Sequence, residues 1–311
     1  MKTYKKILFL LPVIFLLGFA TLRFCTKTIV EETIQIGITT GLIETVALND
    51  EESISCELRF VEVMVECDKE GTINIFEPGT YSVTYTAVYS DRVEVVSTTI
   101  LVLSEYYSSV VGLSGNSLFF GLRNLMQSTV STLPYGEARY ILQESDVDPK
   151  NPNNVRLAYN HESVPKEWDG GVTWEREHVF PVSRLGVNRP GNSSNNLSTD
   201  LHNLIPIQRG ENVIKSNKGL DLVTSEEYYY IENDKGLAAR ILFYMVLTYS
   251  QLYLGEEVGE LQMGRLSVLE YWNLKYEPDD FEINRNNVIA SYQGNRNPFI
   301  DYPLFWELIK K

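Results

Sequence analysis

Histidine is scarce in this chain of 311 residues, which holds only three, and cysteine is equally rare, again with three. No Cys-x-x-Cys pair or combined Cys/His spacing indicates a zinc site. Positive charge is in deficit as well, since the formal net charge is −14. This balance excludes a protein coated in basic surface for holding nucleic acid, so any contact with a polyanion must be local.

The N-terminus has the pattern of an export signal. Three lysines among the first six residues precede an apolar run over residues 7–20, which ends in the small residues Gly18 and Ala20. This order is typical of a cleaved secretory signal. An uncleaved anchor is the alternative, because the apolar stretch reaches Leu22, slightly short of the ~20 residues that span a bilayer. We therefore predict a signal peptide or membrane anchor over residues 1–25, and a protein that is secreted or anchored at the outer face of the cell membrane.

Residues 26–103 are rich in Val, Ile, Thr and Tyr with a period of two, most clearly over 80–88 and 93–100. Strict alternation is typical of half-buried strands. The segment PGTYSVTYTA, which begins at Pro78, resembles a strand entry found in immunoglobulin-like modules of bacterial surface proteins. The resemblance implies a small all-β Ig-like sandwich over 26–103, without catalytic residues, that serves in spacing or adhesion.

Two of the cysteines lie in strand-like segments of this module. Export would place Cys56 and Cys67 in an oxidising environment, where a disulfide between them could close a short loop. Two buried free thiols are the alternative.

After Ser104 the composition changes toward helices and irregular loops. Apolar residues at helical spacing predict a helix over 116–129 and a longer one over 236–253, both as core elements. Between them, residues 146–154 hold two prolines and three asparagines and are predicted to form a connecting loop. The loop's Asp146 and Asp148 could hold calcium, but the glycine and distal glutamate of an EF-hand are missing.

The most informative stretch is 174–219, which contains two of the three histidines and in which six basic residues outnumber four acidic ones. It reads WEREHVFP from Trp174, then DLHNLIP from Asp200, then GENVIKSN from Gly210. An imidazole can take a proton near neutral pH. A carboxylate and a side-chain amide can hold a hard cation. Cleavage of a phosphodiester bond needs both of these capacities.

The three motifs are also spaced for a common site. The segment leading into His178 and the apolar run 201–207 could pair as an antiparallel ribbon, with 183–199 as the loop between them. A helix opening near Gly210 would place Asn212 close to its start. Strand, strand and helix would then bring an imidazole, a carboxylate and an amide to one point.

At these residues the sequence resembles the endonuclease I family of secreted and periplasmic nucleases, within the His-Me finger (ββα-metal) superfamily. The resemblance extends to 107–112, to 146–159 and to 279–303, where the chain reads NRNNVIASYQGNRNPFIDYP from Asn284. It implies an α+β fold with several helices for residues 104–311. Glu175 stands where the family often has an amide, and Phe180 replaces a common tryptophan.

The resemblance also implies roles for individual residues. His178 would be the general base, and Glu177 and Asn212 would hold one Mg²⁺ or another divalent cation such as Mn²⁺ or Ca²⁺. Each of the three residues also has a purely structural interpretation. His178 could be a structural histidine, Glu177 a surface carboxylate, and Asn212 a helix cap. His202 is expected to support the ribbon rather than to act in catalysis, together with Asp200 and Asn203.

A cation is still needed to hold the scissile phosphate, because a planar guanidinium pairs with two phosphate oxygens at once. Arg176 is the catalytic candidate, and Arg184, Arg296 and Lys215 are candidates for substrate binding. Arg296, in the QGNRN segment, could equally be part of a buried turn.

These expectations describe an exported, metal-dependent endonuclease that cuts DNA, with RNA as a second substrate, without strong sequence specificity and leaving 5′-phosphate ends. The alternative is a cell-surface binding or adhesion protein whose nuclease-like domain has lost activity. A zinc hydrolase built on His178 and His202 is disfavoured, since no HExxH motif or third ligand accompanies them.

Overall fold

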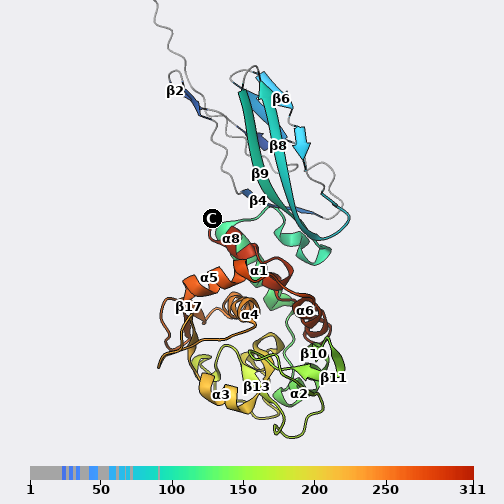
Figure 1. The fold of residues 1–311 in the computed structure, drawn as a ribbon, viewed down its shortest axis with the longest axis vertical. Coiled ribbons are helices and arrows are strands. Elements are labelled where there is room, and N and C mark those ends of the chain that lie inside the picture. Colours follow the sequence, from blue (N-terminus) through green and yellow to red (C-terminus); the bar gives the residue numbers. More distant parts are fainter. Residues whose placement is uncertain are drawn as a thin grey trace, which may run out of the picture. The chain divides into compact units, whose positions relative to one another are not determined.

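The computed structural model describes residues 73–89 and 92–311 and, before them, the backbone of seven short strands. The chain divides into two compact units, Met1–Glu105 and Tyr106–Lys311, and each is described here by itself (Figure 1). The predicted signal segment falls almost wholly outside the described residues. No helix among the described residues is long and apolar enough to cross a membrane.

The first unit contains only strands in its described part. They are β1 (Arg23–Cys25), β2 (Thr28–Val30), β3 (Thr33–Gln35), β4 (Leu42–Ala47), β5 (Cys56–Phe60), β6 (Val63–Glu66), β7 (Asp68–Glu70), β8 (Gly79–Tyr89) and β9 (Arg92–Leu103). They form sheets in the orders β4-β9-β8-β7, β1-β5-β6 and β2-β3. The strongly alternating segments at 80–88 and 93–100 are the two strands of the long hairpin β8–β9, paired from Gly79↔Val102 to Tyr89↔Arg92. The Ig-like module stays a prediction, and the Cys56–Cys67 pair lies outside what the structure describes.

The second unit is α+β, a set of helices with several small sheets. Its helices are α1 (Gly115–Thr129), α2 (Tyr135–Ser145), α3 (Arg209–Lys215), α4 (Lys235–Thr248), α5 (Leu266–Lys275), α6 (Asp280–Gln293), α7 (Pro298–Asp301) and α8 (Phe305–Ile309). Its strands are β10 (Val147–Asp148), β11 (Asn151–Arg156), β12 (Ser163–Pro165), β13 (Glu175–His178), β14 (Leu204–Ile207), β15 (Gly219–Leu220), β16 (Tyr228–Tyr229), β17 (Tyr253–Gly255) and β18 (Gln262–Gly264).

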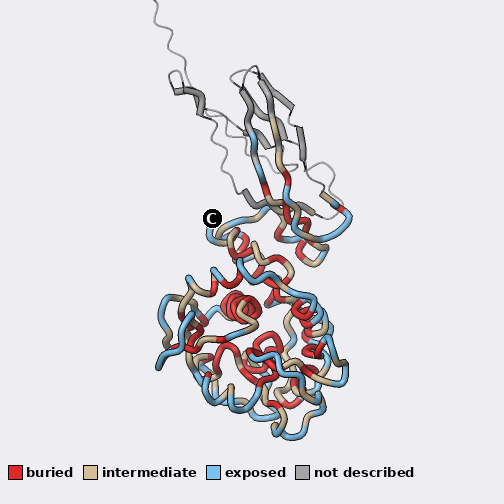
Figure 2. The backbone as a smooth tube through the Cα atoms, viewed as in Figure 1, coloured by how far each residue is buried: buried red, intermediate tan, exposed pale blue. Residues whose placement is uncertain are grey.

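Helix α4 is the centre of this unit. Every residue from Gly236 to Thr248 is buried, and Figure 2 shows the helix as a continuous buried coil surrounded by the other elements. A helix that is apolar on all sides belongs inside a core. The helix predicted over 236–253 is therefore present but ends earlier, because Tyr249 already has extended backbone and residues from Tyr253 onward form β17. The helix predicted over 116–129 is confirmed as α1.

The prediction of a plain loop at 146–154 is wrong in part. Strands β10 and β11 form a hairpin there, and β12 extends it to three strands. The carboxylate of Asp146 is buried and lies 3.0 Å from Nε of Arg285, so the guanidinium of Arg285 balances its charge. Asp148 accepts a hydrogen bond from the backbone N–H of Lys150 and closes the turn of the hairpin.

The predicted ribbon is present as the antiparallel pair β13–β14, in the register Glu175↔Ile207 to His178↔Leu204. Its second strand starts at Leu204 rather than at Leu201, because the Asp200 carboxylate caps a 3₁₀ turn by accepting from the N–H of His202. Helix α3 follows two residues after β14 and packs against β13 (Figure 1). Trp174, Leu201 and Leu204 anchor the ribbon to a buried cluster that also includes Ile289 of α6.

Candidate active site

A pocket of about 470 Å³ opens beside the end of β13. Four of the predicted site residues line it, namely Arg176, Glu177, His178 and Asn212. The loop after β13, the first residue of α2 and the C-terminal end of α3 supply the remaining walls. The structure therefore brings together the imidazole, the carboxylate and the amide singled out in the sequence.

His178 is held in one tautomer by the backbone. Its Nε2 lies 2.8 Å from the carbonyl oxygen of Ser198, and a carbonyl can only accept, so Nε2 carries the hydrogen. The lone pair is therefore on Nδ1. Burial lowers the pKa of the imidazole to about 4, while the bond to Ser198 opposes that shift. At neutral pH the ring is uncharged and able to accept a proton.

The Ser198 carbonyl is itself positioned by a short motif that sequence reasoning missed. The Asn196 side chain accepts from the N–H of Ser198 at 2.9 Å and from its hydroxyl at 2.8 Å. The hydroxyl of Thr199 accepts a hydrogen bond from the N–H of Asn196. This bond completes a capping box around the 3₁₀ turn Leu197–Thr199. The signal in the sequence is Asn-Leu-Ser-Thr, a capping residue followed three positions later by a hydroxyl.

Glu177 lines the pocket, is buried and is ion-paired with Lys215. Burial raises the pKa of the Glu177 carboxyl, and the neighbouring ammonium of Lys215 lowers it. Lys215 is fully buried and is not among the residues that line the pocket. Its ammonium thus lies behind the carboxylate, which does not fit the predicted contact with substrate.

Asn212 is oriented by a residue at the other end of β13. Its Nδ2 donates to Oε2 of Glu175 at 3.0 Å, and the second oxygen of Glu175 lies 3.6 Å from Nε of Arg209. With the NH₂ group committed to Glu175, the amide presents its oxygen to a different partner. Glu175 therefore fixes which way Asn212 is turned.

The donor set at the pocket can be tested against the metals that proteins bind. Glu177 and Asn212 offer one carboxylate and one amide oxygen, which are hard ligands suited to Mg²⁺, Mn²⁺ or Ca²⁺. Within 73–89 and 92–311, no group of three or more His, Cys, Asp or Glu side chains could hold a metal. The residues thus fit a hard cation that keeps several waters, and they do not fit a fully protein-ligated zinc site.

Of the three predicted arginines, one lines the pocket and two are held elsewhere by other partners. Arg176 lines the pocket, with its guanidinium 3.6 Å from the ring centre of Tyr135 and a hydrogen bond to the Tyr135 carbonyl. Arg184 donates to the carbonyls of Asn217 and Gly259 at 2.8 and 2.7 Å and so joins two loops. Arg296 makes a bidentate pair with Asp301 at 2.6 and 2.7 Å, and neither Arg184 nor Arg296 lines the pocket.

Among the lining residues that were not predicted, an arginine and a tyrosine lie where they can serve the site. Arg189, in the loop after β13, is exposed and lines the pocket. Tyr135 begins α2, and its ring stacks on the His178 imidazole with centroids 5.6 Å apart and 24° between the planes. Neither belongs to a motif around the histidines, because the fold brings both from outside β13, β14 and α3.

The three residues expected to give structural support are all buried. His202 lies 3.1 Å from the Asn295 carbonyl through Nε2. Asn203 pairs with both backbone groups of Phe180, at 2.7 and 3.0 Å, and thereby joins the two sides of the ribbon.

Asp200 is the hub of this support. It accepts hydrogen bonds from the hydroxyls of Tyr244 and Tyr249, both at 2.7 Å, and from Nε2 of Gln293 at 2.9 Å. Hydrogen bonds to Asp200 thus connect the DLHNL segment to α4, to Tyr249 directly after α4, and to the last residue of α6.

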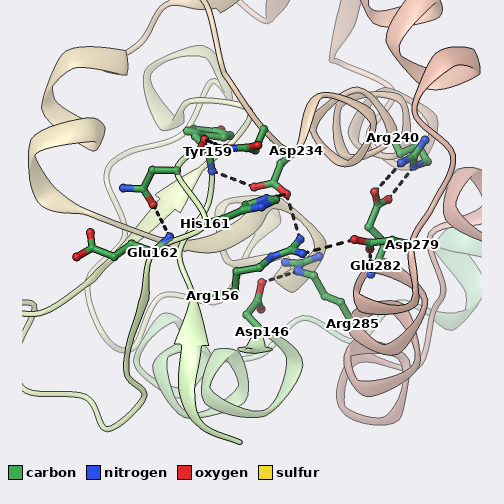
Figure 3. Close-up of polar contacts among 12 residues, drawn as sticks. Asp146, Arg156, Tyr159, His161, Glu162, Asp234, Arg240, Asp279, Glu282 and Arg285 are labelled. Atoms are coloured by element: carbon green, nitrogen blue, oxygen red, sulfur yellow. Dashed lines mark hydrogen bonds and ion pairs between the residues drawn. The ribbon is translucent and has the colours of Figure 1, made fainter. Parts of the chain in front are cut away.

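The third histidine belongs to a separate polar cluster (Figure 3). Nε2 of His161 lies 2.7 Å from Oδ1 of Asp234, which also contacts Nη2 of Arg156 at 3.1 Å. The other oxygen of Asp234 accepts from the N–H of Tyr159. This cluster borders a second pocket of about 210 Å³, and every oxygen of Asp234 already has a partner.

Comparison with known proteins gives consistent matches. The model of the family described as Endonuclease I matches residues 223–304. The extracellular ribonuclease of Bacillus subtilis (strain 168) is 36% identical over 225 residues, which cover 64% of this chain and 75% of the relative. An extracellular ribonuclease of Bacillus amyloliquefaciens is likewise 36% identical, over 222 residues, with the same shares covered. The extracellular deoxyribonuclease of Aeromonas hydrophila is 26% identical over 153 residues, covering 43% of this chain and 65% of the relative.

Proposed function

The chain belongs to the endonuclease I family, and we propose that it is an exported, metal-dependent endonuclease that hydrolyses phosphodiester bonds of DNA and RNA. The observation that carries the proposal is the convergence of His178, Glu177 and Asn212 on one pocket. Residues 104–311 would form the nuclease domain, with the strand–strand–helix unit β13, β14 and α3 as its His-Me finger.

His178 is proposed as the general base. Its Nε2–H is committed to Ser198, and its low pKa leaves Nδ1 unprotonated at neutral pH. Nδ1 would take the proton of the attacking water, a contribution typically worth 10²–10⁴-fold. Stacking on Tyr135 holds the plane of the ring while the proton moves.

Glu177 and Asn212 are proposed as the protein ligands of one divalent cation, Mg²⁺ or a related ion. When bound, the ion supplies positive charge against the scissile phosphate and the departing 3′ oxygen. Cleavage on that side of the phosphorus leaves a 5′-phosphate end. Glu175 contributes indirectly, by keeping the amide oxygen of Asn212 free for the ion.

Substrate contact is proposed for Arg176 and Arg189, the two arginines that line the pocket. Both would address phosphate, which DNA and RNA share, so no strong sequence preference is expected. The names of the relatives support both substrates, since two are called ribonucleases and others deoxyribonucleases.

Export is proposed from the N-terminal segment 1–25 and from the extracellular location in the names of the relatives. The segment 26–103 is proposed as an Ig-like spacer or adhesion module, separate from the chemistry. Digestion of nucleic acid outside the cell would then be the purpose of the protein.

One experiment tests the proposal. The purified full chain is incubated with supercoiled plasmid and, separately, with a single-stranded RNA, in Mg²⁺ and in EDTA, beside His178→Ala. We expect cleavage of both substrates that EDTA abolishes and that His178→Ala reduces at least a hundred-fold. Intact plasmid and intact RNA in the Mg²⁺ samples would contradict the proposed endonuclease activity.

That same result would favour the second candidate, a surface-binding protein with an inactive nuclease-like domain. The presence of His178, Glu177 and Asn212 at one pocket argues against it, because the proposed base and the two proposed metal ligands that the reaction needs are all there.

A further inference from the structure

Lys215 is the most unusual charged residue near the pocket. It is the last residue of α3, and none of its surface is exposed. Removing an ammonium from water is strongly unfavourable unless its surroundings offset the loss of hydration. A lysine is therefore fully buried only where specific acceptors receive its hydrogens.

The acceptors of Lys215 all belong to one short stretch of β13 and the residue after it. Its Nζ forms an ion pair with the Glu177 carboxylate and donates to the carbonyls of His178 and Val179 at 3.1 and 3.2 Å. Two carbonyls and one carboxylate oxygen therefore surround the ammonium, which has three hydrogens to offer. The side chain thus ties α3 to the strand that carries both Glu177 and His178.

Lys215 and Asn212 share one face of α3, because they are three residues apart. One turn of the helix therefore delivers an amide oxygen to the pocket and a cation to the back of the carboxylate beside it. Without a positive neighbour, a carboxylate as buried as that of Glu177 would be strongly disfavoured.

We propose that Lys215 is a positioning residue that serves as an internal cation for Glu177. In the metal-free protein its ammonium faces the carboxylate and holds it in place. When a divalent cation binds, the ion takes over part of that charge balance, and Lys215 stays anchored by the carbonyls of His178 and Val179. The inference depends on the proposed role of Glu177 as a metal ligand.

The test compares the full chain with Lys215→Met, Lys215→Arg, Glu177→Gln and the double variant Glu177→Gln/Lys215→Met. The melting temperature of each is measured in EDTA and in Mn²⁺, and Mn²⁺ binding is followed by calorimetry. In EDTA we expect Lys215→Met to melt roughly 10 °C lower, since it leaves a buried carboxylate unpaired. The double variant should recover at least half of that loss, because both buried charges are gone.

The rise in melting temperature that Mn²⁺ causes in each variant tests the role proposed for Lys215. We expect it to be larger in Lys215→Met than in the parent protein, because the ion then neutralises a carboxylate that has no other partner. Lys215→Arg keeps the charge and should give a gain close to that of the parent. If Lys215→Met lost the same stability in EDTA and in Mn²⁺, so that its gain from Mn²⁺ equalled that of the parent, the role proposed for Lys215 would be overturned.

The two proposals fail in different ways. A parent protein that neither binds Mn²⁺ nor gains stability from it would contradict the metal site itself. A parent that binds Mn²⁺, together with a Lys215→Met variant whose gain is unchanged, would contradict only the role given to Lys215. A double variant no more stable than Lys215→Met would also overturn it, since the ion pair would then not be what Lys215 contributes.

Discussion

The carbonyl of Ser198 accepts the Nε2–H of His178 across 2.8 Å, and this bond decides which nitrogen of the imidazole can act as a base. A backbone carbonyl cannot rotate away or change its protonation state, so the tautomer is fixed by the path of the loop 183–199. The loop in turn depends on Asn196, whose side chain holds Ser198 by two hydrogen bonds.

Asn196→Ala should lower kcat about ten-fold with little change in KM. The substitution removes the acceptor that places Ser198, and small misplacements of a reacting group are costly. Steady-state cleavage of a short duplex would measure both constants. Asn196→Asp keeps the acceptor and is the matched control. A kcat for Asn196→Ala equal to that of the parent would show that the carbonyl is placed by other contacts.

Glu175→Ala should weaken divalent-cation binding by about ten-fold, in the range expected for partners that orient a metal ligand. The substitution frees the NH₂ group of Asn212, so the amide no longer presents its oxygen in one direction. Calorimetric titration with Mn²⁺ measures the affinity. Glu175→Gln retains an oxygen acceptor and should bind nearly as tightly as the parent. Equal weakening in both variants would point to charge rather than to orientation.

Arg189→Gln should raise KM and reduce the dependence of kcat/KM on salt. A phosphate contact contributes about 0.9 to the slope of log affinity against log salt on duplex DNA, so the slope should fall by about one. Arg296→Gln is the control, since its guanidinium is paired with Asp301 and does not line the pocket. We expect that control to lower the melting temperature and to leave the salt slope as it was.

His202 should make the protein less stable in mild acid. Burial lowers the pKa of its imidazole to about 4, below the ordinary value of 6.5. Above pH 6.5 the ring is neutral in both the folded and the unfolded state, and its contribution is complete. Between pH 6.5 and about 4 the unfolded chain takes up a proton that the folded chain refuses, so the free energy of unfolding falls by about 1.4 kcal/mol per pH unit.

Urea denaturation at several pH values, compared between the parent and His202→Gln, isolates this contribution. The glutamine amide can still donate to the Asn295 carbonyl but does not titrate. The difference in unfolding free energy between the two proteins should shrink as the pH falls from 6.5 toward 4. A difference that stays constant over this range would contradict the assignment.

Much of the second unit was predictable, because local patterns and core packing agree there. The helix over 116–129 and the pairing of the strands that carry His178 and Leu204 follow from periodicity and spacing. Predictions failed where a side chain acts locally against the pattern. Asp200 caps a turn and shortens β14, and in the Pro- and Asn-rich segment 146–154 Asp148 closes the turn of a hairpin by accepting from the N–H of Lys150.

The sequence by itself determined which chemical groups are available: imidazole, carboxylate and amide side chains within residues 174–219, in motifs that resemble those of the endonuclease I family. Only the tertiary structure decided which basic side chains face the pocket. Lys215 and Arg189 are equally charged in the sequence, yet α3 turns Lys215 onto the back of Glu177, while the loop after β13 leaves Arg189 exposed at the pocket. Charge is a property of the residue type, but the burial and the partners of that charge depend on how distant segments pack.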